Sequence, residues 1–563
     1  MKKYTAVMIA FVLTFGILTG CGDSDANVSV EADQSIAVSD TDGESAEIPD
    51  WDEYSALIDE IMSTADLARR EALMHEAEDM LMETGIILPV YHYNDTYMQK
   101  DYISGIYSSP LGVRFFMFSK TPEGTLRSDI SGEPDELDPA LCKGIQDATM
   151  AINSFAGLYS YDANGRVIPD LAADEQVSED GLTYTVTLLP DLKWSDGSKL
   201  DADDFIYAWN RAANEETGAA YAYMFDVIGR NDDGTLRVEA SDEGQVITIR
   251  LASPCAYFNE LLAFPVYFPV KQSEVEKTSD WETYPGEWAK EAGFISNGAY
   301  TLTDWIRGES MTYTKNPYYH RADEVETGTL QFMPCEDDAA AYRSYSSGYL
   351  DFMESVPDDM IADMLDDQEL HMIDIPGTCY VIFNWNGSLF AGKSAEQASA
   401  MRRAFALLVD REYICNYVTG AGQKPANTYI PPCMSDGNGG IFKANDDSYT
   451  FPNEGNAGYF DPHWSADSVE KAIGLLEHAG FKFENGMLSA ENPISFEYLV
   501  DDDPVHIAVA EALQQDFTEI GIDMTINIAG QDKFIREKEA GNYDAAYGGR
   551  FANFNDPVCM LEN

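Results

Sequence analysis

The sequence predicts an α/β protein of two or three domains, and two observations support this class. Helical and strand patterns interleave along the chain, which is typical of α/β folds. At 563 residues, the chain is also too long for one ordinary hydrophobic core. Hydrophobic residues make up 45% of it, so each domain has enough apolar side chains to fold.

The first 21 residues have the pattern of a bacterial lipoprotein signal peptide. Lys2 and Lys3 precede an apolar run that ends in Leu18-Thr19-Gly20-Cys21. The run is short for a membrane span, and the small residue before Cys21 suits signal cleavage. We therefore expect lipidation of Cys21 and an extracytoplasmic protein anchored to the outer face of the cell membrane, in the periplasmic space or at the cell surface.

Acidic residues greatly outnumber basic ones. The chain has 98 Asp and Glu against 35 Lys and Arg, a net charge of -63. Such a charge repels nucleic acid and anionic membrane surfaces, so a nucleic-acid partner is excluded. Residues 22–50 are rich in Asp, Glu and Ser and should form a disordered acidic tether. We interpret the remaining charge as the solubility of an exported protein.

The sequence contains no recognisable catalytic or metal-binding motif. GxSxG, HExxH, Walker A and GxGxxG patterns are absent, and His75-Glu76 lacks a second metal ligand. We therefore predict no catalytic residues, no metal, no cofactor and no enzymatic activity.

The cysteines other than Cys21 form an odd set without a CxxC pair. We interpret them mainly as small buried hydrophobic residues. An exported location would permit a disulfide, but the sequence does not say which pair would form. The set is Cys142, Cys255, Cys335, Cys379, Cys415, Cys433 and Cys559.

Local patterns predict the first helix and strand. Leu73, Ala77, Met80 and Leu81 fall at i, i+4, i+7 and i+8, which is one face of a helix. The stretch from Ile86 to Met98 follows as a strand.

A strand, a turn and a helix are predicted next. Thr183–Leu189 has the composition of a strand, and Lys193–Gly197 that of a turn. A helix should start at Asp201, because the carboxylate of this residue can cap its first turn. Phe205 and Trp209 then lie on one face of that helix.

Near the C-terminus, a helix and a half-buried strand are predicted. The helix carries apolar residues from Ala510 to Ile520, and Gly521 can end it. From Ile522 to Ile528, apolar and polar residues alternate as in a strand with one buried face.

Four stretches resemble the oligopeptide- and dipeptide-binding proteins of ABC importers, which are extracellular solute-binding proteins of family 5. Together the matches cover nearly all of residues 121–563. The stretches are Leu192–Trp209 (LKWSDGSKLDADDFIYAW), Asn297–Tyr300 (NGAY) with Lys315–Tyr319 (KNPYY), Met401–Arg411 (MRRAFALLVDR), and Tyr543–Gly549 (YDAAYGG) running into Asn555–Pro557 (NDP).

The resemblance implies a two-lobed periplasmic-binding-protein-like fold of class II, the large peptide-binding type, in which crossing strands form the hinge. The first lobe would comprise residues 95–155 and 281–376, with an extra sub-domain at residues 156–280. The second lobe would comprise residues 377–563, completed by residues 51–94.

The order of the segments departs from that of the family. In such proteins, segments resembling Tyr54–Ile58, Arg69–Glu78 and Leu88–Tyr93 follow the Asn-Asp-Pro region, whereas here they precede the family's N-terminal motif, Glu133–Pro139. We therefore hypothesise a circular permutation with the old ends joined near residues 120–124, since exposed loops tolerate new termini. The alternative is a fused or misassembled gene whose front piece complements a neighbouring molecule.

The resemblance also implies the ligand contacts, in a family that holds a peptide by its backbone while water-filled pockets accept varied side chains. The residues at matching positions are Lys143, Gly144 and Ile145 where one lobe meets the ligand backbone, the cleft tyrosines Tyr221 and Tyr93, the strand residues Gly549, Arg550 and Phe551, and the weaker matches Tyr380 and His506.

One departure concerns the ligand's charge. The family aspartate that pairs with a peptide's α-ammonium falls at Asn553, and losing such a charge-assisted bond costs roughly 1.5–3 kcal/mol. Peptides with a free N-terminus should therefore bind less well, unless Asp556 or another acid replaces it. Arg550 replaces the family's usual tryptophan, and Lys143 occupies a position that can be acidic. These changes predict an anionic, blocked or non-peptide ligand.

The function implied is that of a substrate-binding lipoprotein that captures oligopeptides or peptide-like solutes for an ABC importer. Its partners would be a permease and ATPase complex, and it would act as a monomer. Two alternatives stay open: a surface receptor that senses peptides in signalling, and a binder of a non-peptide solute.

Overall fold

The computed structural model describes residues 51–437, 440–445, 447, 449–453 and 457–562. The predicted signal peptide, Cys21 and the predicted tether lie outside these residues. Within them, no helix combines the length and the apolar character that crossing a membrane requires.

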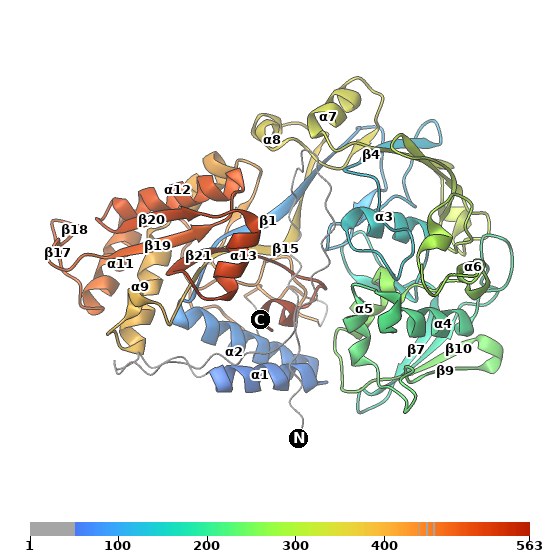
Figure 1. Ribbon diagram of the computed structural model, residues 1–563, viewed down its shortest axis with the longest axis horizontal. Coiled ribbons are helices and arrows are strands. Elements are labelled where there is room, and N and C mark those ends of the chain that lie inside the picture. The colour runs from blue at the N-terminus through green and yellow to red at the C-terminus, as the bar shows by residue number, and fades with distance from the viewer. Residues whose placement is uncertain (1–50, 438–439, 446, 448, 454–456, 563) are drawn as a thin grey trace.

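The described chain forms two lobes, and two long antiparallel strands run between them (Figure 1). These strands are β1 (Ile87–Gln99) and β15 (Leu370–Phe383). Their register shifts after Pro89 and again after His92, so bulges interrupt the ladder in the middle of β1. The two-lobed α/β fold that the resemblance implied is confirmed.

One large mixed sheet extends through both lobes in the order β11-β12-β13-β4-β14-β1-β15-β21-β19-β20, and β16 pairs with β1. The first-lobe strands are β4 (Thr125–Ile130), β11 (Tyr300–Ile306), β12 (Ser310–Lys315), β13 (Thr329–Pro334) and β14 (Phe352–Met353). The second-lobe strands are β16 (Lys424–Pro425), β19 (Ser495–Val500), β20 (Asp523–Ile528) and β21 (Ala545–Phe551).

A separate antiparallel sheet, of order β7-β8-β10-β9, marks a sub-domain of the first lobe. Its strands are β7 (Ala172–Val177), β8 (Thr183–Leu188), β9 (Val238–Ser241) and β10 (Val246–Arg250). Short strand pairs complete the structure: β2 (Tyr107–Ser108) with β3 (Arg114–Phe115), β5 (Tyr159–Tyr161) with β6 (Val167–Pro169), and β17 (Phe483–Glu484) with β18 (Met487–Leu488).

Helices cover the sheets on both sides of the hinge (Figure 1). Those of the first lobe are α3 (Ile145–Ser154), α4 (Ala202–Ala212), α5 (Phe258–Leu262), α6 (Gln272–Val275), α7 (Asp338–Ser346) and α8 (Asp358–Met364). Those of the second lobe are α9 (Ala395–Leu408), α10 (Arg411–Tyr413), α11 (Ala466–His478), α12 (Pro504–Thr518) and α13 (Gln531–Glu539).

The elements with clear local signals are found where the sequence predicts them. The side chain of Asp201 caps α4, and Asp204 returns a bond to the Asp201 backbone N–H, which completes a capping box. Two details differ. Helix α12 ends at Thr518, before the predicted Ile520. Ile528 is exposed, because it is the last residue of β20 at the end of the sheet.

The front block, α1 (Trp51–Ser63) and α2 (Leu67–Thr84), packs beside α14 (Val558–Leu561). The Tyr54 hydroxyl donates to the Leu561 carbonyl at 2.9 Å. Arg70 donates two hydrogen bonds to Asp556, at 2.7 and 2.8 Å. Residues far apart in sequence therefore hold the front block in place.

Three apolar cores organise the described residues. One lies within the second lobe, between its sheet and α9, α11 and α12. A smaller one lies around Met98 of β1, Tyr345 of α7 and Ile361 of α8. The largest fills the first lobe and continues into α1, α2 and α14. Part of this continuity is a parallel stack of Tyr257 on Phe554, with ring centroids 4.5 Å apart.

All seven cysteines of the described residues are free thiols. Five are buried, as predicted, but Cys335 and Cys433 are partly exposed. The interpretation of the cysteines as mainly buried residues is therefore confirmed, and the two exceptions lie in loops rather than in a core element.

Candidate ligand-binding site

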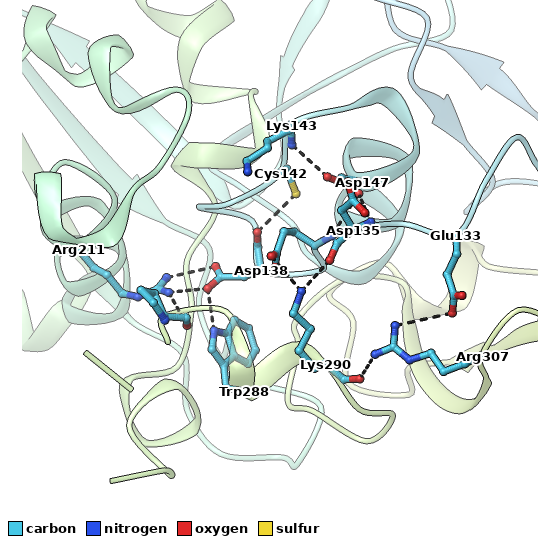
Figure 2. A network of polar contacts seen from close by, with 12 residues as sticks. Glu133, Asp135, Asp138, Cys142, Lys143, Asp147, Arg211, Trp288, Lys290 and Arg307 are labelled. Atoms are coloured by element: carbon cyan, nitrogen blue, oxygen red, sulfur yellow. Dashed lines mark hydrogen bonds and ion pairs between the residues drawn. The ribbon is translucent and has the colours of Figure 1, made fainter. Parts of the chain in front are cut away.

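The loop that carries Lys143 and Gly144 is held by two buried carboxylates (Figure 2). Asp147, in the first turn of α3, accepts hydrogen bonds from the backbone N–H groups of Lys143 and Asp135, at 3.0 and 3.1 Å. Burial raises the pKa of Asp147, and these backbone bonds oppose that change. The loop therefore enters α3 in a fixed conformation.

Asp138 anchors the same loop to the rest of the first lobe. It is fully buried and accepts hydrogen bonds from Arg211 and from the indole N–H of Trp288, the latter at 2.8 Å. Figure 2 shows these side chains converging on Asp138. Because Arg211 and Trp288 lie far along the chain, only the tertiary structure reveals this anchor.

The predicted contacts of the first lobe come together. Gly144 caps α3 without a side-chain bond, and Ile145 is its first residue. The Tyr221 hydroxyl donates to the Lys143 carbonyl at 3.3 Å, while the Lys143 side chain is exposed to solvent. Tyr221 packs edge-on against Phe264, at 4.8 Å between centroids.

The second lobe presents a cluster of aromatic side chains at the hinge. The Tyr93 hydroxyl lies 2.9 Å from the Tyr547 hydroxyl, and the Tyr93 ring lies 4.4 Å from that of Phe551. The His506 ring stacks on Tyr547 at 3.9 Å, and its Nδ1 lies 2.8 Å from Asp501. Tyr93, His506 and Phe551 were predicted as contacts, and the structure brings them together.

Gly549 leaves room for this cluster. A Cβ at this position would lie 2.9 Å from the Tyr547 hydroxyl and 3.0 Å from the Tyr93 hydroxyl. Any larger residue would therefore push the two hydroxyl groups apart.

Tyr380 and Arg550 are not part of the aromatic cluster. In the β15–β21 register, Tyr380 pairs with Gly548 and Thr378 pairs with Arg550. Successive strand residues point to opposite faces, so Tyr380 and Arg550 lie on the other face from Gly549 and Phe551. There the Tyr380 ring packs on Gly548, and Arg550 donates to the Cys559 carbonyl at 2.7 Å.

Asn553 and Asp556 follow β21 in the last described segment. Asn553 is exposed, and its backbone N–H donates to the Cys559 sulfur at 3.1 Å. Asp556 is buried in its ion pair with Arg70, with side-chain exposures of 3% and 2%. Asp556 is therefore unavailable to a ligand ammonium, because binding one would break this pair.

Sequence reasoning missed three residues of the second-lobe cluster: Tyr547, Asp501 and Lys538. Burial lowers the pKa of Lys538 to about 8, and Asp501 opposes this change. Tyr547 stands two residues before Gly549 on the same strand face, so strand alternation is a signal that could have identified it. Asp501 and Lys538 have no such local signal.

The two sets of predicted contacts approach each other along β1. The Asp95 carboxylate and the Ile145 side chain flank Gly112, at 3.6 and 3.9 Å from the position of a Cβ on that glycine. Asp95 stands two residues after Tyr93 on the crossing strand. Away from these residues, a surface pocket of about 630 Å³ lies between α2 and α9.

The comparisons with known proteins agree with one another over most of the chain. The model of the bacterial extracellular solute-binding proteins, family 5, matches residues 166–563. The oligopeptide-binding protein OppA of Bacillus subtilis strain 168 is 27% identical over 454 residues, covering 78% of this chain and 77% of its own length.

Two further relatives give the same result. The dipeptide-binding protein DppE of the same organism is 28% identical over 452 residues, covering 78% of this chain and 76% of its own. The unliganded open form of the periplasmic murein tripeptide binding protein MppA superposes with a TM-score of 0.64 at 24% identity, covering 82% of each chain.

Proposed function

Because this chain belongs to the bacterial extracellular solute-binding proteins of family 5, we propose that it captures oligopeptides or peptide-like solutes between its lobes for an ABC importer. The observation that carries this proposal is the match of one family model to residues 166–563, which include parts of both lobes. Members of this family are binding proteins, so the chain is not an enzyme.

The geometry supports a site at the hinge. The Lys143–Ile145 loop offers backbone groups from the first lobe beside Tyr221, and the cluster of Tyr93, His506 and Phe551 offers aromatic surface from the second. Backbone hydrogen bonds give affinity without selecting a sequence, and tyrosines provide apolar surface with a polar tip. A peptide therefore suits both halves of the site.

The ligand is tested most directly by native mass spectrometry of the purified protein with the solute that it retains. We expect a mass increment that fragments into amino acids. Calorimetry with a pool of short peptides should then give saturable binding. A retained non-peptide, together with no heat from any peptide, would contradict the proposal and favour a different solute.

Lipid anchoring and the partner complex belong to the same proposal. Cys21 would carry the lipid, and a permease with its ATPase would receive the loaded protein. Cys21→Ser should release the protein from the membrane fraction without changing ligand affinity. Retention of this variant in the membrane would contradict an anchor at this residue.

We also infer that the unusual order of segments is a circular permutation. Strand β1 lies inside the large sheet between β14 and β15, and α1 and α2 pack on α14 of the same chain. Tyr54 and Leu561 are joined by a hydrogen bond, so a short linker could connect the front block to the last described segment.

A reordered chain tests the permutation. In this variant, residues 121–562 come first, and a short linker joins them to residues 51–120. We expect a monomer with one cooperative unfolding transition and unchanged ligand affinity. An obligate dimer of the natural chain, with residues 51–99 crosslinked to the second lobe of its partner, would instead support exchange between molecules.

A further inference from the structure

Glu354, which follows β14, has a carboxyl group without a hydrogen-bond partner. The residue is 9% exposed, and its Oε1 is buried without any such partner among the described residues. Its backbone N–H donates to Oδ1 of Asp129 at 2.9 Å. The other oxygen of Asp129, Oδ2, is likewise buried and without a partner. Buried acceptors of this kind are rare in folded proteins and call for an explanation.

The charges around Glu354 are unbalanced. The guanidinium of Arg114 acts electrostatically on Glu354 but is hydrogen-bonded to other groups: Nη2 donates to Asp95 at 2.5 Å, and Nη1 donates to Ser108. Glu354 experiences the charges of Arg114, Asp129 and Asp95. Three carboxylates against one guanidinium leave an excess of two negative charges when all are ionised.

The position of this acidic group relates it to the site. Asp95 lies on β1 after Tyr93, and it shares the surroundings of Gly112 with Ile145. Asp95 therefore lies on the crossing strand between the aromatic cluster and the Lys143–Ile145 loop, and Glu354 follows Met353, which pairs with Met98 further along the same strand.

A cationic group of the ligand would give these carboxyl groups hydrogen-bond donors and a counter-charge. An unpaired buried carboxylate is costly, so it either takes up a proton or finds a counter-charge. Burial raises the pKa of Glu354 to about 8 and that of Asp129 to about 7. Within the described residues, no group of His, Cys, Asp and Glu is arranged to hold a metal ion. A primary ammonium group, with three donors, fits the vacant acceptors better.

We propose that Glu354, supported by Asp95 and Asp129, binds an ammonium group of the ligand, in place of the contact that Asn553 does not provide. This inference rests on the proposed function and assigns the ligand class: peptides with a free α-amino group or a lysine side chain. It is the opposite of the preference for anionic or blocked ligands that Lys143 and Arg550 suggested. Arg550 donates a hydrogen bond to the Cys559 carbonyl, and the Lys143 side chain is exposed to solvent.

Four versions of one short peptide test the proposal by calorimetry. They are a free N-terminus without lysine, its N-acetylated form, the N-acetylated form with one lysine, and the same peptide with that lysine acetylated. We expect the wild-type protein to bind at least one cationic version about tenfold or more tightly than its neutral counterpart. The cationic version that binds more tightly than its neutral counterpart shows whether the site takes the α-amino group or the lysine side chain.

Glu354→Gln should remove this preference, so that the cationic and neutral versions bind with similar affinity. Glu354→Asp, which keeps the charge on a shorter side chain, should retain part of it. Glu326→Gln is the matched control, because Glu326 is an exposed first-lobe acid paired with Lys120. Equal wild-type affinity for cationic and neutral peptides, or an unchanged preference in Glu354→Gln, would overturn the ammonium site and leave peptide capture intact. Binding of none of the four would overturn both.

Discussion

Arg70 and Asp556 form a buried bidentate ion pair that joins α2 to the last described segment. Removing the arginine would leave a buried carboxylate without its counter-charge, although the backbone N–H of Val558 would still donate to it. We therefore expect Arg70→Met to lower the free energy of unfolding by about 3–5 kcal/mol, as measured by urea denaturation.

Arg69→Met is the control for this change. Arg69 pairs with Glu60 at the surface, where both side chains are about half exposed, so its loss should cost at most about 1 kcal/mol. Similar losses in the two variants would contradict the importance of the buried pair.

Glu78 gives a pH dependence whose sign follows from its environment. Burial raises its pKa to about 7, while Oε1 accepts hydrogen bonds from the backbone N–H groups of Tyr429 and Ile430. The folded state therefore binds this proton more tightly than the unfolded state, whose pKa is about 4.5. The associated stability is present at low pH and is lost as the pH rises through about 7.

Glu78→Gln keeps the acceptor oxygen and removes the titration. Between about pH 5 and pH 8, the wild type should lose about 2 kcal/mol of unfolding free energy relative to this variant. Denaturant titrations of both proteins across this range measure the difference. A difference that stays constant with pH would show that Glu78 does not titrate in this window.

At the scale of elements, two glycines should respond to alanine in opposite directions. Gly474 lies inside α11 with nothing within 4 Å of an added Cβ, so Gly474→Ala should stabilise the protein by about 0.5–1 kcal/mol. Gly548 lies in β21, where an added Cβ would come within 2.3 Å of the Tyr380 ring. Gly548→Ala should therefore destabilise it by about 1–3 kcal/mol.

Thermal unfolding of both variants measures these effects. Each variant controls for the other, because both add one methyl group to the second lobe. If the unfolding temperatures of both variants shifted in the same direction, the packing of β15 on β21 would not explain the effect of Gly548→Ala.

For the molecule as a whole, the net charge of -63 means that the acidic groups of the folded protein repel one another. Like charges repel most strongly when they are held close together, so the compact state gains from screening. Raising NaCl from about 10 mM to about 0.5 M should therefore raise the thermal midpoint by several degrees. Most of the rise should occur below about 0.1 M NaCl, by which point the Debye length has fallen to about 10 Å. A midpoint independent of salt would contradict net self-repulsion.

The two lobes also meet outside the hinge. The Tyr257–Phe554 stack and the Arg70 guanidinium 5.5 Å above the Tyr257 ring connect the sub-domain to the front block. This contact involves three segments that are distant in sequence. No local pattern predicts it.

The class of the fold and the elements whose signals are local follow from the amino-acid sequence alone. The capping box at Asp201 and the strand of β1 depend on neighbours within a few residues, and these interactions form in any context that allows the element. The family resemblance then supplied the two lobes.

Which side chains are available for binding depends on the partners that the tertiary structure gives them. This structure commits Asp556 to Arg70, turns Arg550 toward Cys559, and leaves Glu354 without a partner beside the hinge. The physical reason is that a charged group takes its partner from whichever segment packs against it. For Arg70 and Asp556, that packing joins residues 486 positions apart, which no periodicity in the sequence records.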